Sequence, residues 1–185
     1  PGTHDVDLAL HVLKQLAEAG PAQHVTLPGF DKSLDDCRPI EDCQQLRGPI
    51  DIIILEGWCV GAKAQSQNEL THPSNELEIN EDSDSRWRTY VNQKLAGSYQ
   101  SLFEKIHMLL MLQAPGFEQV LEWRNLQEEK LRAHVAKDAS GIMDRMVIER
   151  FIQHFERLTR HCLQTLPDSA DRVFRLDAEH RIHLS

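Results

Sequence analysis

The sequence predicts an α/β fold built on a parallel sheet, and two observations lead to that prediction. Strand-like and helix-like segments alternate along the 185 residues without an internal repeat, as is typical of α/β domains. The runs at residues 52–55 and 107–112 lack polar alternation, as strands do when helices cover both faces of a parallel sheet. We therefore expect one three-layer domain over residues 1–185.

The first 50 residues predict one helix, one short strand and a loop. Apolar side chains recur at helical spacing over residues 7–19, Asp5 or Asp7 can cap this helix, and Gly20-Pro21 ends it. Residues 24–27 predict a brief strand. Residues 28–49 mix Pro, Gly, Asp and Cys without periodicity, which indicates a loop.

The remainder predicts a polar excursion, three helices and three strands. The acidic residues of 62–85 are expected at the solvated surface. Helices are predicted at about 87–106, 117–135 and 144–166, and strands at 107–112, 172–176 and 181–184, with a turn at 177–180. The first of these helices carries one stripe expected to be buried, formed by Trp87, Val91, Leu95, Leu102 and Ile106.

Composition narrows the function classes. The net charge of −9 disfavours a nucleic acid or an anionic membrane as the main partner, because both need concentrated Lys and Arg. No stretch approaches the roughly 20 apolar residues of a membrane span, and no signal peptide is visible. We expect a cytoplasmic protein that binds a small molecule.

Cysteine and histidine spacing indicates neither disulfides nor a structural metal. Cys37, Cys43, Cys59 and Cys162 lack C-x-x-C spacing, which favours reduced thiols. The ten histidines are scattered, and the pair His180 and His183 has no neighbouring cysteine.

Glu56 is the first candidate for chemistry. It directly follows the apolar run 52–55 and precedes Gly57, and functional groups of parallel sheets gather at the carboxyl ends of strands. A carboxylate there can face phosphate and metal. The alternative is an ordinary turn with one exposed glutamate.

Two further candidates lie upstream of Glu56. Asp5, at the head of the first helix, is either a helix cap or a general base for a substrate hydroxyl. In the loop that follows the first strand, Asp31, Lys32 and Arg38 can bind a hydroxy acid, the cations holding its carboxylate and the aspartate its hydroxyl. A solvated turn is the alternative.

A basic segment lies downstream, within the lid-like helical segment 116–140. Arg124, Lys130 and Arg132 fall on or near one side of this helix. A mobile helix of this kind can deliver cations to a transferring phosphoryl group. Surface ion pairs with neighbouring glutamates are the alternative, each worth only about 0.2–0.5 kcal/mol.

Five motifs in order and spacing resemble the P-loop D-glycerate 3-kinase family, which is related to the uridine kinase, phosphoribulokinase and pantothenate kinase group. The match covers nearly the whole chain. The motifs are Pro1-Gly2-Thr3-His4-Asp5, Leu27-Pro28-Gly29-Phe30-Asp31-Lys32-Ser33, Ile54-Leu55-Glu56-Gly57-Trp58-Cys59-Val60-Gly61, Trp123-Arg124-Asn125-Leu126-Gln127-Glu128 and Ser140-Gly141-Ile142-Met143-Asp144.

The resemblance implies a three-layer P-loop fold and transfer of the γ-phosphoryl group of ATP, with Mg²⁺, to a hydroxyl of a small hydroxy acid such as D-glycerate. Glu56 then resembles the acidic, metal-placing residue after the Walker-B-like strand. Asp5, Asp31 and Lys32 resemble substrate-side positions, and Arg124 part of the lid. Lys130 and Arg132 would neutralise phosphate charge beside it.

Two departures from the family pattern leave alternatives open. The loop after Lys32-Ser33 lacks the Gly-Asp-Arg ending of plant relatives, so a nucleoside or a pantothenate-like alcohol stays a possible substrate. No G-x-x-x-x-G-K-[ST] occurs in the chain. We expect the C-terminal portion of a longer kinase without its first strand and phosphate loop, or a non-catalytic, kinase-derived binding or regulatory domain. Either way, runs 52–55 and 107–112 would lose a pairing strand.

Overall fold

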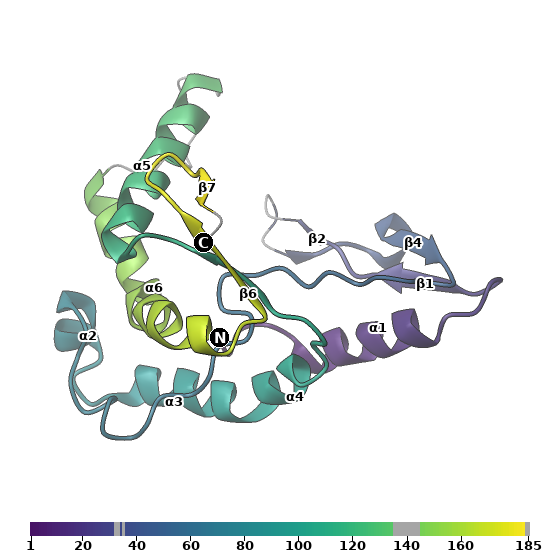
Figure 1. Ribbon diagram of the computed structural model, residues 1–185, viewed down its shortest axis with the longest axis horizontal. Coiled ribbons are helices and arrows are strands. Elements are labelled where there is room, and N and C mark those ends of the chain that lie inside the picture. Colours follow the sequence, from purple (N-terminus) through teal and green to yellow (C-terminus); the bar gives the residue numbers. More distant parts are fainter. Residues whose placement is uncertain (32–33, 35, 135–144, 184–185) are drawn as a thin grey trace. The chain divides into compact units, whose positions relative to one another are not determined.

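The computed structural model describes residues 1–31, 34, 36–134 and 145–183 and has a mixed α/β architecture (Figure 1). Two compact units are present: an N-terminal unit of residues 3–57, and a C-terminal unit of residues 1–2 and 58–185. The expectation of a single domain over residues 1–185 stays a prediction.

The N-terminal unit packs one helix on a two-stranded antiparallel hairpin. Helix α1 (Val6–Glu18) confirms the first predicted helix within about a residue. Strand β1 (His24–Leu27) pairs with β4 (Gln44–Arg47), His24 lying opposite Arg47. Apolar side chains between them form the core of this unit: Leu16, Ala19 and Val25, with Val12, Leu27, Leu46 and Ile50 against them.

The prediction of a loop over residues 28–49 was wrong. This stretch contains the antiparallel pair β2 (Phe30–Asp31) and β3 (Asp36–Cys37), the 3₁₀ turn η1 (Ile40–Asp42) and strand β4. Strand β4 has the sequence Gln-Gln-Leu-Arg, whose side chains do not alternate between apolar and polar as those of a half-buried strand do. Its backbone pairing with β1 therefore determines that it is a strand. Gly48 then passes close to α1, where an added Cβ would lie 2.6 Å from the Ala19 carbonyl oxygen.

The strand predicted at residues 52–55 is also absent. Residues 52–57 have no regular secondary structure, and the side chains of Ile52 and Ile54 are 78% and 85% exposed. The apolar sequence is typical of a strand, but a strand exists only when a neighbour bonds its N–H and C=O groups. The part of the chain that the structure describes supplies no such neighbour for this run.

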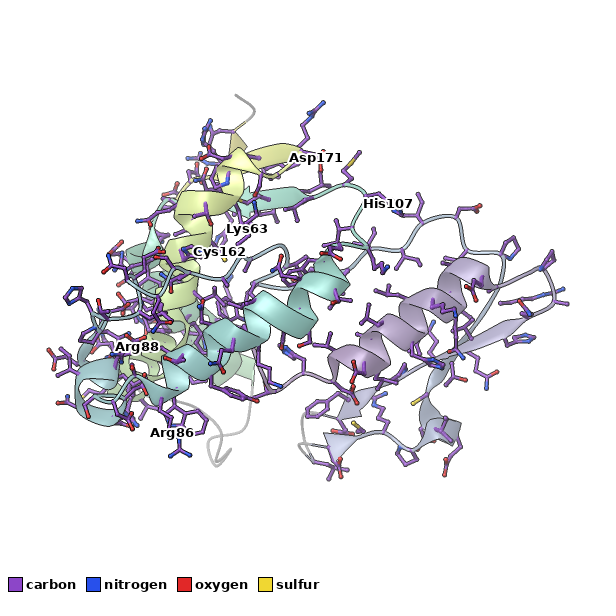
Figure 2. The ribbon with its side chains drawn as sticks, turned by 90° about the horizontal axis from the view of Figure 1, so that it is seen from below. Lys63, Arg86, Arg88, His107, Cys162 and Asp171 are labelled. Carbon is purple, nitrogen blue, oxygen red and sulfur yellow. The ribbon has the colours of Figure 1, made fainter. Side chains whose placement is uncertain are left out.

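The C-terminal unit contains a mixed three-stranded sheet of order β5-β6-β7. Strand β5 (Leu110–Gln113) runs parallel to β6 (Arg172–Leu176), and β7 (Ile182–His183) pairs antiparallel with β6. These strands confirm three of the predictions within a few residues. Asp171 fixes the register, because its carboxylate accepts the Leu109 amide at 2.7 Å and its own amide donates to the Leu109 carbonyl (Figure 2).

Strand β5 is covered on one face only, so the expectation of a fully buried strand was wrong. Met111 is buried, whereas Leu110 and Leu112 on the opposite face are 53% and 63% exposed. Strand β5 lies at the edge of this sheet as far as the structure describes it.

The helices of this unit confirm the helical predictions. The first predicted helix is a continuous run of α3 (Arg86–Lys94), the π-helical η2 (Leu95–Tyr99) and α4 (Gln100–Phe103). The two later helices are α5 (Phe117–His134) and α6 (Arg145–Thr165), with the 3₁₀ turn η3 (Leu166–Asp168) after α6. Helices α5 and α6 share an apolar interface around Phe117, Ile148 and Ile152.

Trp87 corrects one detail of the helical prediction. Its side chain is 66% exposed, while Arg88 beside it is buried. The buried position is taken by Arg88 because this residue binds Asp82 at 3.0 Å and the Leu70 carbonyl at 2.8 Å (Figure 2). Within the described segments, no helix is both long enough and apolar enough to cross a membrane.

The acidic excursion of residues 62–85 is partly buried, which corrects its expected surface position. It contains the short helix α2 (Glu76–Glu81), and Glu78 is only 9% exposed. The Arg157 side chain on α6 donates to both carboxylate oxygens of Glu78, at 2.8 and 2.6 Å, and to the carbonyls of Glu69 and His72. One guanidinium group therefore ties three points of the excursion to α6.

Replacement of Arg157 with alanine should destabilise the protein strongly. The change leaves the Glu78 carboxylate buried without its main cation, and breaking such a pair costs about 3 kcal/mol or more. We expect this loss in the free energy of unfolding measured by urea denaturation. Arg150→Ala is the matched control, because Arg150 on the same helix pairs with the exposed Glu81; equal losses for the two variants would contradict the prediction.

The same pair predicts acid sensitivity. Burial alone would raise the pKa of Glu78, but hydrogen bonds from Arg157 and the Ser74 amide, with the arginine charge, lower it overall from the usual 4.5. Since the folded-state pKa is depressed, this stabilisation is full above about pH 4.5 and is lost as the pH falls through the folded-state value.

The four cysteines are free thiols in two distinct environments. Burial raises the pKa of Cys162 on α6 to about 12 and also raises that of Cys59 (Figure 2). We predict that iodoacetamide at pH 8 modifies Cys37 and Cys43 in the folded protein and spares the two buried thiols, because the thiolate is the reactive form. Peptide mass spectrometry would test this, with urea-unfolded protein as the control; rapid labelling of Cys162 in folded protein would contradict it.

Candidate functional site

A cavity on the C-terminal unit brings two of the predicted site residues together. It has a volume of about 390 Å³ and lies between α5 and the turn that joins β6 to β7. This volume falls within the range of about 300–1,000 Å³ that small-molecule sites occupy. Its lining side chains are apolar, aromatic and cationic: Val120, Trp123, Arg124, Leu126, Gln127, Lys130 and His180.

Arg124 is held in place by other residues of α5. Its guanidinium forms an ion pair of 2.5 Å with Glu128, which is only 3% exposed, and donates to the Gln127 side chain at 2.6 Å. It also lies 5.8 Å from the ring centre of Phe151. The Arg124 Nε–H is buried and lacks a hydrogen-bond partner in the described structure.

The ion-pair alternative for this helix is therefore confirmed for Arg124. The i,i+4 arrangement with Glu128 is more than a surface contact, because the carboxylate is buried and needs a compensating charge. Lys130 is exposed and lines the same cavity. The side chain of Arg132 lies outside the described residues.

Two aromatic rings close one side of the cavity. The Trp123 indole on α5 stacks on the His180 imidazole, with ring centres 4.2 Å apart and planes inclined by 26°. The Trp123 Nε1–H also donates to the Ala178 carbonyl at 2.9 Å. The turn after β6 is thereby attached to helix α5 (Figure 1).

Asp177 builds this turn. Its carboxylate accepts the backbone amides of Glu179 and Arg181, the Arg181 side chain at 2.7 Å and the His183 ring at 3.1 Å. Although desolvation acts in the opposite direction, these hydrogen bonds lower the pKa of Asp177 well below its usual value. His180 follows in the left-handed region, with φ of +64°. The turn predicted at residues 177–180 is confirmed.

The substrate-side candidates lie in the N-terminal unit. Asp5 caps α1, its Oδ1 accepting the Leu8 amide at 2.8 Å, which confirms the capping interpretation. Asp31 in β2 and Arg38 after β3 belong to one hairpin, in which the Arg38 amide donates to the Gly29 carbonyl at 2.9 Å. Lys32, between them, lies outside the described residues.

Glu56 is an exposed residue of the N-terminal unit, and no hydrogen bond or ion pair reaches its carboxylate from the described parts of the chain. Such a carboxylate fits Mg²⁺, which keeps several waters and binds through one or two carboxylates and substrate phosphates. Because Glu56 and Arg124 belong to different units, their grouping in one site stays a prediction.

Sequence reasoning missed Trp123 and His180 as cavity residues. The sequence places His180 in a turn and pairs it with His183 only as a weak metal candidate, whereas both residues bond to Asp177: the His180 amide donates to its carbonyl at 3.1 Å, and the His183 ring lies 3.1 Å from its carboxylate. The available signal is an aspartate, Asp177, three residues before His180 in a turn between two predicted strands. The stacking partner on a distant helix had no signal in the sequence.

Comparisons with known proteins connect this chain to kinases. No family model matches it. An uncharacterized kinase, mug58, of Schizosaccharomyces pombe is 32% identical over 193 residues, which cover 90% of this chain and 64% of the relative. The chain thus spans just under two thirds of the length of that relative.

Solved structures show the same fold. A D-glycerate 3-kinase from Cryptococcus neoformans var. grubii covers 98% of this chain at a TM-score of 0.73 and 24% identity, over 66% of its own length. The YGR205w protein covers the whole chain at a TM-score of 0.68 and 22% identity, over 64% of its own length. The resemblance to glycerate-kinase-like proteins that the five motifs indicate is therefore confirmed.

Replacement of Arg124 with alanine should lower stability, because buried Glu128 loses its compensating charge. We expect a loss of about 2 kcal/mol in the free energy of unfolding measured in urea. Lys130→Ala, on the exposed side of the same helix, should leave that free energy nearly unchanged. Adding Glu128→Leu to Arg124→Ala should recover most of the loss, because the buried carboxylate is then absent; no recovery would show that the ion pair is not the cause.

Proposed function

We propose that this chain forms part of an ATP-dependent kinase that phosphorylates a hydroxyl group of a small hydroxy acid, D-glycerate being the first candidate. The observation that carries the proposal is the 32% identity to a kinase across 90% of the chain. The fold shared with a D-glycerate 3-kinase supports the proposal. The motif around Asp31 supports a hydroxy acid as the substrate, because its aspartate and cations can bind a hydroxyl and a carboxylate.

In this proposal the phosphate-binding loop comes from a segment of the gene product outside these 185 residues, because no G-x-x-x-x-G-K-[ST] occurs within them. Two features of the separate units support such a segment. The apolar run 52–55 is exposed and unpaired in the described structure, and β5 presents an edge with exposed Leu110 and Leu112. Each is the kind of surface that an additional strand covers.

The proposed reaction assigns roles by charge. The acceptor hydroxyl oxygen attacks the γ-phosphorus, the bond to the bridging oxygen of ADP breaks, and Asp31 or Asp5 accepts the hydroxyl proton. Arg38, with Lys32, binds the substrate carboxylate. Glu56 would hold Mg²⁺ through its water shell, and the metal would supply charge neutralisation to the phosphates.

Arg124 and Lys130 would neutralise the transferring group from the helix α5 side. Arg124 can do so only in competition with Glu128, to which it is already bound at 2.5 Å. Lys130 lines the same cavity from the exposed side of α5.

The kinase proposal is tested by ADP release from the full gene product, assayed with ATP, Mg²⁺ and a panel of D-glycerate, other small hydroxy acids, nucleosides and pantothenate. We expect turnover with a hydroxy acid. Glu56→Gln should lower kcat by about 100-fold or more and leave the unfolding transition in place.

Glu41→Gln is the control for Glu56→Gln, because Glu41 is an exposed glutamate of the same unit. Full activity of Glu56→Gln would remove Glu56 from the mechanism. No turnover by a folded gene product with any acceptor would favour the non-catalytic, kinase-derived binding domain instead.

A further inference from the structure

We propose that Tyr90 and Tyr99 are positioning residues of the proposed kinase, because their hydroxyl groups hold the backbone of Gly2, three positions before Asp5. The inference rests on the proposed function and takes Asp5, of its two candidate bases, as the one that accepts the proton. The chain has two tyrosines, and both bind the same residue. The Gly2 N–H donates to the Tyr99 hydroxyl at 3.0 Å, and the Tyr90 hydroxyl donates to the Gly2 carbonyl at 3.1 Å.

The contact requires glycine at position 2. The φ of Gly2 is +97°, which lies in the region that favours glycine. A Cβ at this position would lie 2.6 Å from Cε1 of the Tyr90 ring. Any other residue would therefore strain the backbone and displace the ring, so the two hydroxyls reach the backbone only because Gly2 has no side chain.

The π-helical segment η2 allows both tyrosines to reach one residue. Tyr90 and Tyr99 are nine positions apart, which in a regular α-helix is about 2.5 turns and places the side chains on opposite faces. Segment η2 ends at Tyr99, and a π turn accommodates about one additional residue. The spacing is then about 2.2 turns, so the two side chains project from neighbouring faces. Single π turns within α-helices occur frequently at functional sites.

The helix that carries both tyrosines is itself bound to a second backbone segment of the same unit. The Asn92 side chain accepts the Gln65 N–H at 2.7 Å and donates to the Gln65 carbonyl at 2.9 Å. The Gln100 side chain donates to the Ala62 carbonyl at 2.9 Å. These bonds come from residues on both sides of η2, so they fix the helix where the two hydroxyls meet Gly2.

A fixed Gly2 limits the positions that Asp5 can take. Tyr99 is 3% exposed and packs edge to face with Phe103, with ring centres 6.0 Å apart, so its ring has little freedom to move. The chain from Gly2 to Asp5 spans at most about 11 Å. A general base must lie within hydrogen-bond reach of the proton that it accepts, and a displacement of about 1 Å can lower a rate about 100-fold. The two hydroxyls thus act on the reaction through Asp5.

Tyr99→Phe is the test variant, because it removes the hydroxyl and keeps the packed ring. In the full gene product, with the acceptor that gives turnover, we expect kcat to fall about tenfold. The calorimetric Kd for ATP should stay the same, which separates lost positioning from a loss of folded protein. Gly2→Ala should lower kcat in the same way, since it disturbs the contact from the other partner.

A double-mutant cycle with Asp5→Asn tests whether the effect passes through Asp5. Asparagine caps helices about as well as aspartate, so this variant keeps the cap of α1 and removes the base. If the hydroxyl acts through Asp5, adding Tyr99→Phe to Asp5→Asn should lower kcat no further. The same tenfold loss in both backgrounds would indicate a purely structural role and would overturn the inference.

Ser98→Ala is the matched control, because it removes a hydroxyl from the same π-helical segment that is not bonded to Gly2 in the described structure. An unchanged kcat in Tyr99→Phe, or full activity of Asp5→Asn, would overturn the positioning role and leave the kinase proposal intact. A folded gene product that turns over no acceptor would remove the kinase proposal, and the positioning role with it.

Discussion

The C-terminal unit depends on one constraint: a carboxylate removed from water must be paired with a cation. Three acids are buried in the described part of this unit, and an arginine binds each of them. Two of these arginines also donate to backbone carbonyls of the segment 62–85, which has few apolar residues of its own. Ion pairs and hydrogen bonds of charged groups thus hold residues 62–85 in place, because this segment has too few apolar side chains to be held by hydrophobic packing alone. The pairs are Asp82–Arg88, Glu78–Arg157 and Glu128–Arg124.

The same constraint shapes the cavity. Arg124 is both the cation that compensates buried Glu128 and a lining residue whose Nε–H has no partner in the described structure. A ligand anion that approached it would share the guanidinium with Glu128 rather than capture it. We infer that Arg124 contributes a fixed positive charge to the cavity wall.

Much of the fold was predictable because helices and strand types depend on local patterns. Helices α1, α5 and α6 and strands β5, β6 and β7 lie within a few residues of their predicted positions. The errors share a cause, since each concerns a partner distant in the sequence. The run at residues 52–55 has the composition of a strand, but no neighbouring strand pairs with it in the described structure. Strand β4 has few residues that favour strands, and it is a strand because its backbone pairs with β1.

For the site, the sequence by itself determined which residues carry charge and which family the motifs resemble, because these properties belong to residue types and their order. It placed Arg124 and Lys130 on one helix, and that helix is present. Only the tertiary structure decided that Glu128 is buried against Arg124, and that His180 stacks on Trp123 across 57 positions of the chain. Burial and stacking depend on which surfaces meet, and local periodicity carries no information about contacts between distant segments.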